Sequence, residues 1–309
     1  MRRRLIFGSA LALVVAACSA DTAEPTTVPT ASPDGVSTAR AERPAILPVL
    51  ASSELSAGPN RFLFSLTDSA GNLVASPDLD VQLGFYEADR GPDDASFETG
   101  SRFVWTIDGE RGLYVADAEF PSGGRWGTRF QATSPDGVTE SVRVEYDVLD
   151  ESWTPAIGAP APAVETPTAD SVAGDLSRLS TDPSPEPRFY ETSVAEALDA
   201  GDPFVLVFAT PSFCQTATCG PMLDLVKAQA ADHPDLTFIN VEPYVMEFLD
   251  GSLRPVLSAE GTLQAAPWTD AWRLLTEPYV VVVDGDGLVR AKFEGAFAPD
   301  ELAAVVEGL

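Results

Sequence analysis

Two cysteines, Cys214 and Cys219, are the side chains best suited to chemistry in this chain. They stand five positions apart in the stretch PSFCQTATCGP, where Pro221 suits the first turn of a helix. A thiol at a helix N-terminus faces unpaired backbone N–H groups and the positive end of the helix dipole, and both favour the reactive thiolate. We therefore predict thiol–disulfide exchange, with Cys219 as the nucleophile and Cys214 as the resolving thiol.

The elements around these cysteines predict an α/β domain over residues 188–309. Ser193 and Glu196 have the spacing of a helix capping box, and Gly201 suits the end of that helix. Residues 204–210 and 236–241 are largely apolar runs, as expected for strands that are covered on both faces. The other expected elements are a helix after the cysteines, a partly helical stretch in 263–275, a hairpin of 279–283 and 288–293 around the turn DGDG, and a last helix in 299–306.

This order of elements, with Cys-Gly-Pro at a helix start, resembles the thioredoxin family over residues 188–309. The resemblance implies a cis-proline at Pro278 that faces the cysteines and shapes a substrate groove. The chain departs from the family in its Cys-x4-Cys spacing, where Cys-x2-Cys is usual, and in Glu277, where a small or β-branched residue is more common. If the longer spacing is an insertion, Cys214 matches the first family cysteine, so the reverse assignment of the two thiols stays open.

Other uses of the thiols also stay open. The pair could form a static disulfide that stiffens the loop, in a thioredoxin-like domain that serves as a redox-inert binding scaffold. Copper chaperones of the Sco-like branch share this fold, and soft thiolates suit copper(I). They add a distant histidine, however, and the single histidine here, His233, is expected at the far end of the cysteine helix, ~20 Å away. We therefore predict no metal site and no cofactor, and a copper(I) chaperone that binds the ion through the two cysteines alone stays open as a less favoured alternative.

Residues 46–150 predict an all-β, immunoglobulin-like sandwich. Alternation places Phe62, Phe64 and Leu66 on one face, and turn-forming residues separate further short strands. These further strands are expected within 81–85, 103–105, 113–120, 126–132 and 142–148. No cysteine lies in this region, so no intersheet disulfide is expected. Trp126 is interpreted as a core residue.

The first residues indicate export. Residues 1–17 combine three arginines with an apolar run that is shorter than the ~20 residues of a membrane span, as in a secretory signal peptide. The run ends in VAACS, which resembles the bacterial lipobox, whose cysteine receives lipid such as palmitate. This resemblance implies that Cys18 anchors the protein by lipid to the extracytoplasmic face of the cell membrane. No other stretch of the sequence is apolar enough to cross a membrane.

Composition and charge complete the expected organisation. Residues 18–45 predict a disordered tether, and residues 151–187 predict an extended linker rich in Pro and Ala. The net charge of −28 argues against nucleic acid as a partner, because phosphates would be repelled. Outside the cytoplasm, Cys214 and Cys219 are expected to pair as a disulfide. The expected partners are exported proteins that carry thiols or disulfides.

Overall fold

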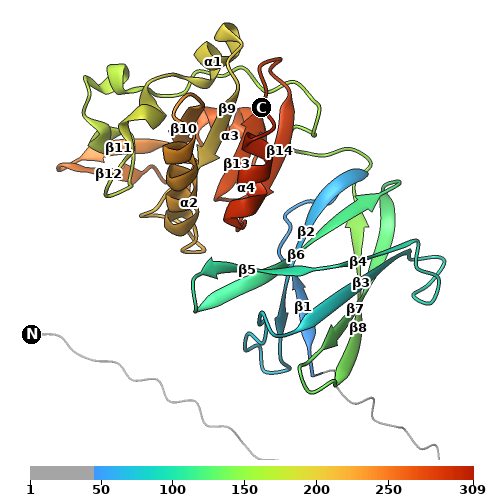
Figure 1. Ribbon diagram of the computed structural model, residues 1–309. Helices are drawn as coiled ribbons and strands as arrows, with labels where there is room; N and C mark the ends of the chain where they lie inside the picture. The colour runs from blue at the N-terminus through green and yellow to red at the C-terminus, as the bar shows by residue number, and fades with distance from the viewer. Residues whose placement is uncertain (1–44) are drawn as a thin grey trace, which may run out of the picture. The chain divides into compact units, whose positions relative to one another are not determined.

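The computed structural model describes residues 45–309, which contain 14 strands, four α-helices and three short 3₁₀ helices (Figure 1). The described protein is therefore mixed α/β, with most of its regular structure in β-sheets. The predicted signal peptide, Cys18 and nearly all of the predicted tether lie outside the described residues. Among the helices of residues 45–309, none is long and apolar enough to cross a membrane.

The first eight strands form two antiparallel four-stranded sheets, in the orders β1-β2-β6-β5 and β4-β3-β7-β8. Their bounds are β1 Leu47–Leu50, β2 Gly58–Thr67, β3 Asp80–Glu87, β4 Phe97–Gly100, β5 Arg102–Ile107, β6 Arg111–Phe120, β7 Gly124–Thr133 and β8 Thr139–Val148. Phe62, Phe64 and Leu66 are buried in a core shared by the two sheets, as their alternation predicts. Trp126 is buried in the same core, which confirms its interpretation as a core residue.

The C-terminal part is built on a four-stranded sheet in the order β10-β9-β13-β14. β9 and β10 run parallel, whereas β13 is antiparallel to both β9 and β14. The strands of this part are β9 Phe204–Phe208, β10 Thr237–Val241, β13 Tyr279–Val283 and β14 Val289–Glu294, with a separate hairpin of β11 Met246–Leu249 and β12 Ser252–Pro255. Its helices are η3 Pro187–Tyr190, α1 Val194–Ala200, α2 Cys219–Asp232, α3 Pro267–Trp272 and α4 Pro299–Val306.

Both faces of this C-terminal sheet are covered by helices. Val205 and Val207 of β9 share a core with the apolar residues of α2 and α4, which lie on one face (Figure 1). Leu206 lies between Val205 and Val207 in the strand, so its side chain points to the opposite face. There it packs with residues of α1 and with Trp272 of α3. All five residues of β9 are buried, which explains why this strand has an unbroken apolar sequence.

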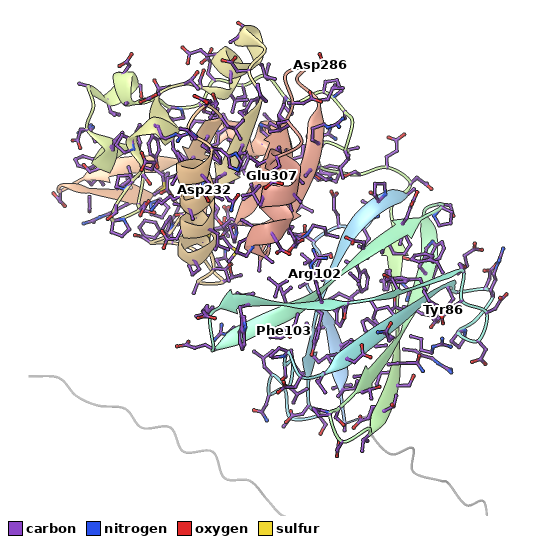
Figure 2. The ribbon with its side chains drawn as sticks, viewed as in Figure 1. Tyr86, Arg102, Phe103, Asp232, Asp286 and Glu307 are labelled. Carbon is purple, nitrogen blue, oxygen red and sulfur yellow. A yellow bond between two sulfur atoms is a disulfide. The ribbon has the colours of Figure 1, made fainter. Side chains whose placement is uncertain are left out.

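Local sequence signals near the ends of the elements are confirmed. The Ser193 hydroxyl accepts from the Glu196 backbone N–H, and the Glu196 carboxylate accepts from the Ser193 N–H, so both halves of the capping box form. Gly201 ends α1 with a left-handed φ of 71°. The DGDG turn joins β13 to β14, and Asp286 lies exposed at its tip (Figure 2). The β11–β12 hairpin was not predicted.

The segment of residues 151–187 packs against the C-terminal part. It contains η1 Ala169–Val172 and η2 Leu176–Arg178. Its backbone pairs with the β13–β14 hairpin, since the Ala161 N–H donates to the Gly287 carbonyl at 2.8 Å. Leu176 and Leu179 pack against the core that contains α2 and α4. This segment therefore belongs to the same compact unit as the sheets on either side of it in the sequence, within residues 45–309.

Polar and apolar contacts join the N-terminal sheets to the C-terminal part within that unit. The Lys292 ammonium of β14 donates to the Thr154 hydroxyl at 2.8 Å and lies 3.4 Å from the Glu54 carboxylate. The Arg61 guanidinium of β2 donates two hydrogen bonds to the Glu301 carboxylate of α4. Leu63, between Phe62 and Phe64, points away from the sandwich core and is buried in the core of α2 and α4.

Candidate functional site

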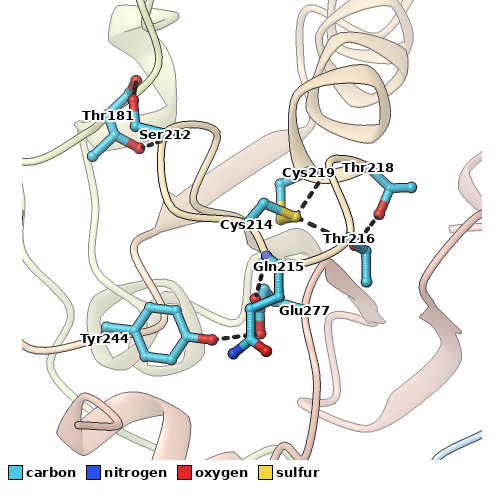
Figure 3. Close-up of a disulfide and its surroundings, with 9 residues drawn as sticks. All are labelled: Thr181, Ser212, Cys214, Gln215, Thr216, Thr218, Cys219, Tyr244 and Glu277. Carbon is cyan, nitrogen blue, oxygen red and sulfur yellow. Dashed lines mark hydrogen bonds between the residues drawn. A yellow bond between two sulfur atoms is a disulfide. The ribbon is translucent and has the colours of Figure 1, made fainter. Parts of the chain in front are cut away.

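The cysteine pair lies on the loop that connects β9 to α2 (Figure 3). β9 ends at Phe208 and α2 begins at Cys219, so the helix starts at a cysteine as the sequence predicts. Cys214 and Cys219 form a disulfide with their Cα atoms 5.9 Å apart. The predicted pairing is therefore present in the described residues.

The two sulfur-bearing residues differ in exposure. Cys219 is 0% exposed and packs in the core of α2, whereas Cys214 is partly exposed on the loop. The backbone N–H of Cys219 donates to Cys214 Sγ at 3.2 Å. Cys214 Sγ also lies 3.4 Å from the Thr216 hydroxyl. Cys214 is thus the residue of the pair with exposed surface, and a helix N–H contacts its sulfur, which favours the reverse of the predicted roles.

Pro278 lies at the same end of the sheet as the cysteine loop. Tyr279, the first residue of β13, pairs with Phe208, the last residue of β9, so Pro278 falls beside the point where the loop begins. The peptide bond before Pro278 is cis, as the family resemblance implies. The structure therefore brings the neighbourhood of Pro278 to the cysteine loop, although the two are far apart in the sequence.

Glu277 and Tyr244 form a part of this site that sequence reasoning missed. The Glu277 carboxylate accepts from the Tyr244 hydroxyl at 2.7 Å and from the backbone N–H of Gln215 at 3.5 Å (Figure 3). Burial, followed by the bond to Glu277, raises the pKa of Tyr244 above its ordinary value. The only sequence signal was Glu277 itself, an unusual residue to find before the proline.

A second buried acid, Glu242, is connected to the cysteine loop through hydrogen bonds. Glu242 follows β10 and is 3% exposed, and its carboxylate accepts from the Thr181 backbone N–H at 2.6 Å. The Thr181 hydroxyl in turn accepts from the Ser212 N–H of the cysteine loop at 3.2 Å. Burial raises the pKa of Glu242 to about 7, against the hydrogen bond from Thr181 that lowers it.

The remaining candidate for metal binding lies away from the loop. His233 follows the last residue of α2, a 14-residue helix whose first residue is Cys219, so imidazole and thiols are at opposite ends. Within residues 45–309, no cluster of three or more His, Cys, Asp or Glu side chains is arranged to hold a metal ion.

Comparison of the chain with models of known protein families and with curated proteins finds no match.

Proposed function

We propose that this protein is a lipid-anchored thiol–disulfide exchange protein of the extracytoplasmic face of the membrane. Residues 188–309 form its thioredoxin-like domain, and residues 46–150 form an immunoglobulin-like sandwich. The observation that carries the proposal is the unequal pair on the loop: a partly exposed Cys214 bonded to a buried Cys219 at the first position of a helix.

The order of elements supports the domain assignments. In the C-terminal part, a four-stranded sheet has helices on both faces, and the cysteine loop connects one of its inner strands to a helix. This is the arrangement that the resemblance to thioredoxins implies. In the N-terminal part, two antiparallel sheets share one core, as in an immunoglobulin-like sandwich.

In the proposed reaction, the partner protein reacts with Cys214, the more exposed residue of the pair. A partner thiolate attacks Cys214 Sγ, the Cys214–Cys219 bond breaks, and Cys219 leaves with the electron pair and takes up a proton. A second partner thiolate then attacks the partner's sulfur in the mixed disulfide, the bond to Cys214 breaks, and Cys214 leaves as a thiolate that takes up a proton. The partner is thereby oxidised to a disulfide, and the pair gains two electrons and two protons. The reverse sequence reduces a partner disulfide. In the reduced form, the Cys219 N–H is placed to stabilise a Cys214 thiolate.

A groove beside the loop offers a path for a partner polypeptide. It has a volume of about 460 Å³ and begins at Ser212 and Phe213, directly before Cys214. Its other wall is formed by the turn and second strand of the β11–β12 hairpin, including Leu253 and Arg254. An extended segment lying in this groove would present its own sulfur to the exposed side of the pair.

A redox titration of the full chain tests the exchange function. The protein is equilibrated against thiol–disulfide buffers, free thiols are alkylated, and peptide masses report Cys214 and Cys219 separately from Cys18. A midpoint above about −300 mV is expected for an exchange-competent pair. A disulfide that stays closed below that potential would refute the exchange function and favour the redox-inert binding scaffold instead.

Trapping experiments test the roles of the two sulfurs. A Cys219→Ser variant lacks the thiol that releases Cys214 from a mixed disulfide when a partner disulfide is reduced, so mixed disulfides with exported proteins should accumulate on Cys214. The matched Cys214→Ser variant should accumulate few. The opposite result would restore Cys219 as the sulfur that meets the partner.

The proposed lipid anchor rests on the sequence of residues 1–18. A Cys18→Ala variant should lose both the lipid mass and its place in the membrane fraction. Retention of both would rule out Cys18 as the anchor.

A further inference from the structure

The Glu277 carboxylate lies against the loop that carries the exposed sulfur. Glu277 is 8% exposed, and its side chain points to the loop at Gln215, the residue that follows Cys214 (Figure 3). One oxygen faces the Gln215 N–H at 3.5 Å, and the other accepts from the Tyr244 hydroxyl at 2.7 Å. The carboxylate is therefore held in a defined place against the backbone of the cysteine loop, one residue beyond Cys214.

No cation neutralises this carboxylate within residues 45–309. The ion pairs found there do not include Glu277, so its charge is stabilised by neutral donors alone. On another side of the loop, Lys227 is already paired with Asp182, and Glu242 lies behind Thr181. Lys227 is therefore not free to offset Glu277, and Arg254, which lines the groove beside Phe213, is absent from the ion pairs above.

A fixed negative charge beside a thiol disfavours the thiolate, because the two like charges repel each other in a partly buried site. The disulfide carries no charge and is not affected in this way. Glu277 therefore acts against the Cys219 N–H, which favours the thiolate, and it destabilises the reduced form whenever Cys214 is ionised. Destabilising the reduced form lowers the reduction potential.

We propose that Glu277 is a positioning residue that lowers the thiolate fraction of Cys214 and so shifts the Cys214–Cys219 pair toward a stronger reductant. The inference deepens the proposed exchange function and rests on it. It gives the unusual residue before Pro278 a role in setting the direction of electron flow. The hydrogen bond from the Tyr244 hydroxyl holds the Glu277 carboxylate in place.

The test compares the full-length wild type with Glu277→Gln, which removes the charge and keeps an oxygen for Tyr244. The equilibrium constant for reduction by dithiothreitol should rise about tenfold, which corresponds to about 30 mV for this two-electron couple. After complete reduction, the alkylation rate of Cys214, followed by peptide mass, should reach half its maximum at a lower pH than in the wild type.

Three further variants separate charge from structure. Glu277→Asp keeps the charge and should keep a potential close to that of the wild type. Tyr244→Phe removes the hydroxyl that holds the carboxylate but leaves its charge, so it should give a smaller rise than Glu277→Gln. Glu247→Gln makes the same chemical change on the exposed strand β11 and should change neither measurement.

Failure of this inference is distinguishable from failure of the exchange function. If Glu277→Gln has the wild-type alkylation profile of Cys214 and the wild-type potential, the role of Glu277 is overturned. If the wild-type pair resists dithiothreitol, the exchange function fails instead. The alkylation profile, measured after reduction with a phosphine, then still decides the effect of Glu277 on Cys214.

Discussion

The buried carboxyl of Glu242 should make the stability of the folded protein depend on pH. Its pKa is raised from an ordinary 4.5 to about 7 because burial penalises the charged form. In the window between these values, the folded state keeps a proton that the unfolded chain releases. The free energy of unfolding therefore falls as the pH rises through this window.

The pKa difference sets the size of the effect. Moving a pKa from 4.5 to about 7 corresponds to about 3 kcal/mol, which is the cost of keeping the charged carboxylate buried at pH 8. Glu242 is 3% exposed, so solvent screening does little to reduce this cost. A Glu242→Gln variant cannot ionise, and its amide oxygen can still accept from the Thr181 N–H. It should be about 3 kcal/mol more stable than the wild type at pH 8 and equally stable at pH 4.

Urea unfolding at a series of pH values, with the disulfide intact, measures this difference. Glu294 also has a pKa raised by burial, so the wild type alone does not isolate Glu242. Subtracting the wild type from Glu242→Gln removes that contribution. Glu247→Gln changes an exposed residue of β11 and is the matched control. Its free energy of unfolding should differ from that of the wild type by the same amount at every pH. Equal stabilities of Glu242→Gln and wild type at pH 8 would refute the reasoning.

Three other substitutions or treatments have defined outcomes. Replacing Lys292 with Met leaves the half-buried Glu54 carboxylate without its cation and should lower the free energy of unfolding by about 2 kcal/mol, as measured in urea; an unchanged midpoint would show that this ion pair contributes nothing. Ser193→Ala removes the side-chain half of the α1 capping box and should cost about 1 kcal/mol in the same assay, whereas Ser193→Thr should cost less. Reducing the Cys214–Cys219 bond opens a short loop and should cost about 2 kcal/mol, so a thermal midpoint that does not move on reduction would contradict this estimate.

Local patterns in the sequence predicted the elements that depend on neighbouring residues. The alternation of Phe62 and Phe64 identified the core face of β2, and the unbroken apolar run of β9 identified a strand covered on both faces. The capping pair at Ser193 placed the start of α1 correctly. Each signal works because a strand or helix repeats its geometry every few residues, so the pattern is contained within the element itself.

The burial of Leu63 could not be predicted from alternation within β2. Alternation places Leu63 only on the face opposite Phe62 and Phe64, and the structure buries it there in the core of α2 and α4. The covering residues lie more than a hundred positions away in the chain. A periodic pattern reports which residues share a face, but it carries no information on what packs against the second face.

The sequence by itself determined the reactive residue types of the site, Cys214 and Cys219, and the helix that begins at the second of them. Tertiary structure alone decided which sulfur is exposed, and it brought Glu277 to the loop across 62 residues of sequence. The antiparallel pairing of β13 with β9 produces that approach. Exposure and the field of a distant carboxylate depend on which elements pack together, and the spacing of residues along the chain does not encode that packing.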